Sequence, residues 1–357
     1  MTTVAPLLDG RRIVVCAGSG GVGKTTTAAA LAMGMAERGL KVAVVTIDPA
    51  KRLADALGLE ELGNEPRLVD PARFDEHGVQ IRGELWALML DSKRTFDALI
   101  ERLAPDRETA EEVLSNRIYQ QLSSAVAGSQ EFTAIAKLYE LHQDGDYDLL
   151  ILDTPPSRNA LDFLDAPGRL TRFFQGRAIK MFLRPGTLLG RGTGVVFGLM
   201  ERLTGVDLLH DLSVFFRALA GMIDGFTERA ARVGLLLSDP GTTFLIVTSP
   251  RHDPVEETIF FHGKLRDADM PFGGLVVNRL HRVPDGDGAL PPELSEELAH
   301  RVELAAHELA ALAERDAAEV ERLRARLGDP PTIVVPELDS DVHDVESLAL
   351  VRGHLFG

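Results

Sequence analysis

The sequence predicts an α/β fold in which a mostly parallel sheet is flanked by helices and carries an inserted helical subdomain. Short apolar runs rich in β-branched residues recur along the chain, a glycine-rich loop follows the first of them, and helical patterns separate most of the others. Most of these runs are continuous and not alternating, which is typical of strands that are buried on both faces of a parallel sheet.

Seven runs are expected to form the strands, at residues 12–18, 41–48, 85–91, 148–154, 242–249, 273–280 and 332–338. A helix is predicted over 25–39. It starts on the glycine loop, ends at Gly39 and leads directly into the second strand, which makes a βαβ unit. The longest helix candidate, 293–327, mixes charges of both signs on one face, as a solvated covering helix does.

Two stretches, 93–135 and 159–236, hold helical patterns without a convincing strand and flank the run at 148–154. We therefore expect a core formed by residues 1–92, 136–158 and 237–357. The two helical stretches are expected to pack into one subdomain that binds a client or a partner.

Composition excludes several classes of protein. The chain has 54 acidic and 38 basic residues and a formal net charge of -16, which argues against nucleic-acid binding. Its one cysteine, Cys16, lies in an apolar run and is expected to be buried. One cysteine makes no internal disulfide and no C-x-x-C metal or redox site, so we expect a cytoplasmic protein with neither zinc nor an iron–sulfur cluster. No charge-free apolar stretch approaches the roughly 18 residues of a membrane span.

The glycine loop GSGGVGKTTT, residues 18–27, matches two patterns. As G-x-G-x-x-G it would bind a dinucleotide, and Asp48 would then bind the ribose. As G-x-x-x-x-G-K-[ST] it is a P-loop, in which Lys24 reaches the β- and γ-phosphates and the Thr25 hydroxyl binds Mg²⁺. Lys24 and Thr25 favour a P-loop NTPase, because a dinucleotide loop needs neither. The backbone around the phosphates would come from Gly20, Gly21, Val22 and Gly23.

Two aspartates end predicted strands and are candidates for the chemistry. Asp48 could orient or deprotonate the water that attacks the γ-phosphate, or it could simply cap a helix that begins at Pro49. Asp153 is expected to hold Mg²⁺ directly or through water, with a turn residue as the alternative.

Three segments together resemble the ArsA and Get-pathway ATPases, which are known for arsenite pumping and for delivery of tail-anchored membrane proteins. They are GSGGVGKTTT, then TIDPAKRLADALG as a first switch, and YDLLILDTPPSRNALDFLDAP as a second. The similarity extends to VVNRL and VVPEL, and so covers nearly the whole chain.

This resemblance implies a dimeric, Mg²⁺-dependent ATPase of the deviant Walker A class, whose helical subdomain opens and closes with the bound nucleotide. By matching position, Lys24 would hold the β- and γ-phosphates, Asp48 would position water, and Asp153 would sense the metal. The same match implies that Thr25 binds Mg²⁺, Thr26 contacts the α-phosphate, Asn278 reads adenine and Pro336 begins the adenine-side loop.

The chain departs from the family pattern at several places. It has Arg158-Asn159-Ala160 where Gly-His-Thr is usual and Lys51 where His is common. The cysteines that bind metalloid in arsenite pumps, and the C-x-x-C zinc clasp of eukaryotic members, have no counterpart. We therefore expect no arsenite binding of the familiar kind, and a dimer that is held by other contacts.

Ser19 is the sharpest departure. The family resemblance implies a lysine here that reaches the partner's phosphates, and a serine cannot supply its charge. One hypothesis is a heterodimer with a paralogous ATPase subunit that carries the lysine. The competing one is a homodimer in which Lys51, Arg52 or Arg158 supplies the charge.

The inserted stretch from Arg169 to Arg191 has six basic residues and no acidic one, interleaved with Phe, Met and Leu. It could form a groove for a hydrophobic helical client or make peripheral contact with a membrane, or it could be subdomain core. The leading hypothesis is an ATP-hydrolysing switch that remodels such a client site. The alternatives are a weakly hydrolysing regulatory subunit and a MinD- or ParA-like positioning ATPase. Near the C-terminus, Asp339, Asp341, His343 and Asp344 are predicted to form a turn and a helix cap and not a metal site.

Overall fold

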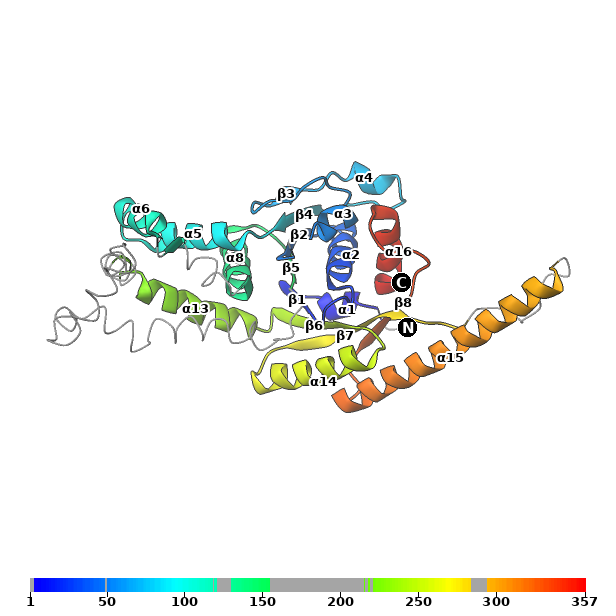
Figure 1. Ribbon diagram of the computed structural model, residues 1–357. Coiled ribbons are helices and arrows are strands. Elements are labelled where there is room, and N and C mark those ends of the chain that lie inside the picture. The colour runs from blue at the N-terminus through cyan, green and yellow to red at the C-terminus, as the bar shows by residue number, and fades with distance from the viewer. Residues whose placement is uncertain are drawn as a thin grey trace, which may run out of the picture. The chain divides into compact units, whose positions relative to one another are not determined.

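The structure is a computed structural model that describes residues 3–48, 50–117, 119–120, 130–154, 215, 218, 221–283 and 294–357 (Figure 1). The chain divides into two compact units. The first consists of Met1–Met89, Asp146–Ala160 and Ser238–Gly357, and the second of Leu90–Gly145 and Leu161–Leu237.

The first unit is built on one eight-stranded sheet with the order β3-β4-β2-β5-β1-β6-β7-β8. Its strands are β1 (Ile13–Ala17), β2 (Lys41–Thr46), β3 (Arg67–Leu68), β4 (Glu84–Met89), β5 (Leu149–Asp153), β6 (Thr242–Thr248), β7 (Phe272–Leu280) and β8 (Thr332–Pro336). All pairs are parallel except β3 with β4. The predicted α/β class, the parallel sheet and all seven predicted strands are confirmed. The sequence did not indicate β3, because two exposed residues make no apolar run.

Helices cover the sheet of this unit. They are α1 (Ala5–Leu8), α2 (Lys24–Glu37), α3 (Arg52–Ala56), α4 (Ala72–Asp75), α14 (His252–Asp267), α15 (Glu296–Leu327) and α16 (Val345–Phe356). Helix α2 packs beside α16, and α14 and α15 lie along β6 and β7 (Figure 1). Alternate residues of the strands, such as Val14 and Cys16 of β1, join α2 and α16 in one apolar core. The predicted burial of Cys16 is therefore confirmed, and burial raises the pKa of its thiol.

The second unit is helical in its described part, with α5 (Ser92–Leu103), α6 (Arg107–Ser115), α8 (Gln130–Asp144) and α13 (Ile223–Leu237). Asp91 and Asp106 cap the first two of these helices by accepting backbone N–H groups. Phe96 stacks on Phe226 with the ring centroids 5.7 Å apart. The basic and apolar stretch from Arg169 to Arg191 lies outside the described residues.

Candidate functional site

The glycine loop joins β1 to α2 and holds the N-terminus of α2 open toward a cavity. Gly23 caps the helix in the left-handed region, with φ 92°. A Cβ on Gly23 would lie 2.2 Å from Nδ2 of Asn278, so the asparagine side chain would have to move, and the left-handed backbone itself favours glycine. Free N–H groups at a helix N-terminus attract anions, and a bound phosphate suits this place.

Lys24 is the first residue of α2, and its side chain is buried along the loop. It is 6% exposed, and its Nζ donates a hydrogen bond of 2.8 Å to the Ser19 carbonyl oxygen. Burial lowers the pKa of Lys24, although the carboxylates of Asp153 and Asp48 act in the opposite direction. An ammonium held this way has its charge directed at the loop, where a phosphate would replace the carbonyl as its partner.

Asp153 is the last residue of β5, and its carboxylate is almost completely buried, at 1% exposure. It lies in register between Cys16 of β1 and Thr46 of β2. Its Oδ2 accepts hydrogen bonds from Thr25 Oγ1 at 2.7 Å and from Thr46 Oγ1 at 2.8 Å. Burial raises the pKa of Asp153 to about 6, while the two hydroxyl donors and then Lys24 counteract part of the rise.

Asp48 follows β2 and lies in the mouth of the cavity. Its Oδ1 accepts the backbone N–H of Ala50 at 2.9 Å, and its Oδ2 pairs with Arg52 Nη1 at 3.2 Å. The alternative prediction that Asp48 caps the next helix is wrong, because α3 begins at Arg52 and its N-cap is Lys51. The carboxylate instead holds the turn that precedes the helix.

The far side of the cavity is formed by the ends of β7 and β8. Asn278 Nδ2 donates to the Val22 carbonyl at 2.9 Å and so ties β7 to the glycine loop. Arg279 follows it with φ 61°, and its guanidinium lies 3.9 Å from Glu337 and 3.6 Å from Asp341. Pro336 ends β8 and also faces the cavity.

The structure brings most of the predicted site residues together around one cavity of about 410 Å³. Those that line it are Gly21, Gly23, Lys24, Thr25, Thr26, Asp48, Asn278 and Pro336. Asp153 lies below the surface and reaches the cavity through Thr25. Gly20 is exposed on the loop, and Val22 contributes its carbonyl to Asn278 while its side chain is buried.

Sequence reasoning missed Thr46 and Arg279. Thr46 is the only polar side chain within the run KVAVVT after its first residue, and its place at the strand end was the available signal. No pattern pointed to Arg279, because its contribution comes from the positive φ that turns the chain after Asn278.

The donor set around Asp153 fits a magnesium ion. Asp153 Oδ1 is buried and makes no hydrogen bond to any described residue, and Thr25 Oγ1 lies next to Oδ2. Mg²⁺ at phosphate sites uses one or two protein oxygens together with water and phosphate, so this sparse set is sufficient. Elsewhere in the described ranges, no three His, Cys, Asp or Glu side chains gather to hold a metal. Asp344 caps α16 through a capping box with Ser347, as predicted.

Comparison with known proteins agrees with this geometry. The anion-transporting ATPase family matches residues 11–290. The chain belongs to this family. It is accordingly classed as an ATPase, with the P-loop fold that the sequence predicts.

Relatives of known name share about a quarter of their residues with this ATPase. An arsenical pump-driving ATPase of Aquifex aeolicus is 26% identical over 69% of this chain, and the match spans only 58% of that protein. The ATPase GET3 of Phaeosphaeria nodorum is 27% identical over 78% of this chain and 80% of its own length. The ATPase GET3C of Arabidopsis thaliana is 26% identical, with 76% and 67% covered.

Ser19 turns inward in this ATPase. Its side chain is 8% exposed, and its buried Oγ has no hydrogen-bond partner among the described residues. Of the three cations that could substitute for the missing lysine, Lys51 is exposed, Arg52 is paired with Asp48, and Arg158 lies outside the described residues.

No helix in the described part of the chain is both long and apolar enough to span a bilayer.

Proposed function

We propose that the chain hydrolyses ATP in the cavity at the glycine loop and uses this reaction as a dimeric switch. One observation carries the proposal: a buried aspartate, Asp153, is hydrogen-bonded to the hydroxyl of Thr25 directly beside the buried ammonium of Lys24. The ammonium of Lys24 and the two oxygens of Thr25 and Asp153 lie together at the N-terminus of a helix. This arrangement of one cation beside two potential metal ligands matches the charge distribution of a Mg²⁺-bound triphosphate.

Each residue has a distinct part in the proposed reaction. Lys24 exchanges the Ser19 carbonyl for the β- and γ-phosphate oxygens and stabilises the charge that moves to the leaving group. Thr25 and Asp153 would hold Mg²⁺, the aspartate directly or through water, and the bound ion would neutralise charge on the phosphates. Asn278 and the loop after Pro336 hold the adenine.

Asp48 is proposed to orient the attacking water. Its carboxylate is fixed on both oxygens, by the Ala50 N–H and by Arg52, so it is held at the mouth of the cavity before the nucleotide binds. A carboxylate within one water of the γ-phosphate can accept the water's proton as the bond forms.

The proposed site lacks one cation. Ser19 takes the place where family resemblance implies a lysine that crosses to the partner's phosphates, and its buried hydroxyl offers no charge. We propose that a paralogous subunit bearing this lysine completes the site. A chain that hydrolyses weakly by itself and regulates that partner is the second candidate, and the same observation favours it.

The proposed client is a hydrophobic helix or a membrane partner that binds the helical unit. Support comes from the composition of residues 169–191, in which basic residues alternate with large apolar ones.

The experiment measures ATP turnover by the purified chain alone, by the chain with a lysine-bearing paralogue, and by Ser19→Lys, with Ser19→Ala as the matched control. We expect weak turnover alone, and an increase of about tenfold or more with the paralogue and with Ser19→Lys, because a positioned cation at transferring phosphates contributes at least that much. Full turnover by the isolated wild-type chain, unchanged by either addition, would refute the need for a partner's lysine.

A further inference from the structure

The long helix α15 has one half that is anchored to the first unit and one half that is exposed. In the anchored half, the buried residues are Ala313, Asp316, Val320, Leu323 and Leu327. In the half that precedes it, every residue from His300 to Glu308 is exposed, including Val302 at 39%. Leu298 is also exposed, at 43%.

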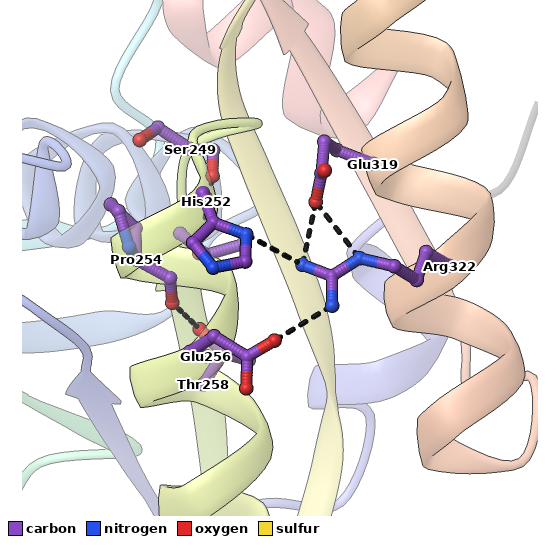
Figure 2. Close-up of polar contacts among 8 residues, drawn as sticks. Ser249, His252, Pro254, Glu256, Thr258, Glu319 and Arg322 are labelled. Atoms are coloured by element: carbon purple, nitrogen blue, oxygen red, sulfur yellow. Dashed lines mark hydrogen bonds and ion pairs between the residues drawn. The ribbon is translucent and has the colours of Figure 1, made fainter.

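The anchored half shows how the helix binds a neighbour. Leu323 is fully buried, and Arg322 beside it donates to Glu256 of α14 at 2.7 Å. Figure 2 shows Arg322 at the centre of this contact, with dashed lines to Glu256, Glu319 and His252. Almost two turns earlier, the buried carboxylate of Asp316 accepts hydrogen bonds from both the backbone N–H and the ring of His281.

The exposed half shares one line of residues with the anchored half. Leu323 and Asp316 are preceded at intervals of seven by Leu309 and Val302, and Arg322 is preceded by Arg315, Glu308 and Arg301. The other buried line of the anchored half, Ala313, Val320 and Leu327, is preceded only by Ala306 and Ala299. On the opposite side of the shared line, the exposed half carries Leu298 and Ala305. Leu298, Val302, Ala305 and Leu309 follow each other at spacings of four, three and four residues, which are those of a short coiled-coil seam with flanking charges. The exposed half therefore has an apolar seam of its own.

We propose that this exposed seam, residues 296–312 of α15, pairs with the same seam of a second copy of the chain in an antiparallel coiled coil. With the two-fold axis between Glu303 and Leu304, Leu298 of each copy meets Leu309 of the second copy, and Val302 meets Ala305 of the second copy. The four apolar residues of each seam are then covered, whereas Leu304, which is 51% exposed, lies outside the seam.

Charge complementarity selects this arrangement. In the antiparallel pair, Arg301 of one copy flanks Glu308 of the other, and the two-fold axis repeats the pair. In a parallel pair the same residues would flank Ala306 and Ala313, so neither charge would have a partner. Within the described ranges neither Arg301 nor Glu308 forms an ion pair in its own chain. The seam is thus self-complementary only when the two helices run in opposite directions.

Small residues favour the same arrangement. The positions that flank the opposite side of the seam are Ala299 and Ala306, which face each other across the two-fold axis. Alanine there lets two helices approach closely, and antiparallel helix dipoles attract. This association uses no residue of the nucleotide cavity and does not depend on the proposed function.

Sedimentation of the full-length chain without nucleotide tests the seam. We expect a concentration-dependent dimer, weakened about tenfold in Arg301→Glu and in Glu308→Arg, because each reversal replaces two attractive pairs by two repulsive ones. The double variant R301E/E308R should regain the wild-type affinity. Circular dichroism and thermal unfolding of each variant verify that α15 is still folded.

A mixture of the two single variants gives the sharpest result. Each variant associates poorly with itself. In a mixed pair, positions 301 and 308 are both acidic in one chain and both basic in the other, so two attractive ion pairs form and the pair should associate as tightly as wild type. A wild-type chain that stays monomeric up to about 1 mM overturns the proposal, because even a small and weak interface should associate at that concentration. So do single variants that dimerise normally, or a mixture that does not associate. A dimer formed at the nucleotide site would be insensitive to Arg301→Glu and Glu308→Arg, so the two associations are separable.

Discussion

Thr25 and Asp153 are 128 positions apart in the sequence, yet Thr25 Oγ1 donates a hydrogen bond of 2.7 Å to Asp153 Oδ2. The contact joins the helix that follows the glycine loop to the strand that carries the buried carboxylate. Thr46 donates to the same oxygen from the neighbouring strand. Two hydroxyls thus fix one carboxylate at the carboxyl end of the central strands, and the proposed metal site depends on that arrangement.

Replacing Thr46 by valine removes one of these donors with little change in volume. We expect the free energy of unfolding at neutral pH to fall by about 1–3 kcal/mol, because the buried carboxylate loses a hydrogen bond. Urea unfolding of the nucleotide-free chain measures the change.

Thr243→Val is the matched control for that substitution. Thr243 lies on β6 and is buried to the same degree, but its hydroxyl has no hydrogen-bond partner among the described residues. Removing an unpaired buried hydroxyl should leave stability unchanged or raise it. Equal losses in the two variants would show that the Thr46 hydroxyl does not stabilise Asp153.

The raised pKa of Asp153 makes stability depend on pH. Because burial disfavours its charged form in the folded state, the folded chain loses stability as pH rises from the carboxyl's ordinary pKa through the folded value of about 6. A shift of that size corresponds to about 3 kcal/mol at neutral pH. Asp153→Asn should therefore stabilise the nucleotide-free chain at about pH 7 and have little effect at about pH 4. A stability difference that does not vary with pH would show that Asp153 is not the group that titrates.

Gly23→Ala should disturb both sides of the cavity. Its Cβ would strike Asn278 and would force a left-handed backbone on alanine, so we expect ATP affinity to fall at least about tenfold. Gly21→Ala is the control, since Gly21 also has positive φ but a Cβ there meets no atom within 4 Å. Isothermal titration with ATP compares the two. Similar losses would mean that backbone strain alone, and not the contact with Asn278, is responsible.

Local signals in the sequence predicted the sheet and most of the cavity. The apolar runs indicated seven strands, and the order G-K-T indicated the start of α2. Both predictions succeeded because a strand run and a glycine-loop helix start depend on residues that are adjacent in the sequence. Parallel strands end at one edge of the sheet, which is why Asp48 and Asp153 could be placed near the loop.

Other features depend on contacts between distant residues, which no local pattern reveals. The hydroxyl of Thr46 gains its importance only from the pairing of β2 with β5. The alternative in which Asp48 caps a helix at Pro49 failed for a local reason, because the helix begins only at Arg52, which pairs with Asp48. The charges on α15 were correctly expected to be solvated over its first half, but its second half is anchored through Asp316 and Arg322.

ATP turnover by Asp48→Asn tests the central claim most directly. It is best measured in the Ser19→Lys background, where a second copy of the same chain can supply the lysine, with Asp55→Asn of the exposed face of α3 as the matched control. We predict that Asp48→Asn abolishes turnover but still binds ATP, while Asp55→Asn hydrolyses it normally, because only the first removes the carboxylate that orients water. Undiminished turnover in Asp48→Asn would contradict the account.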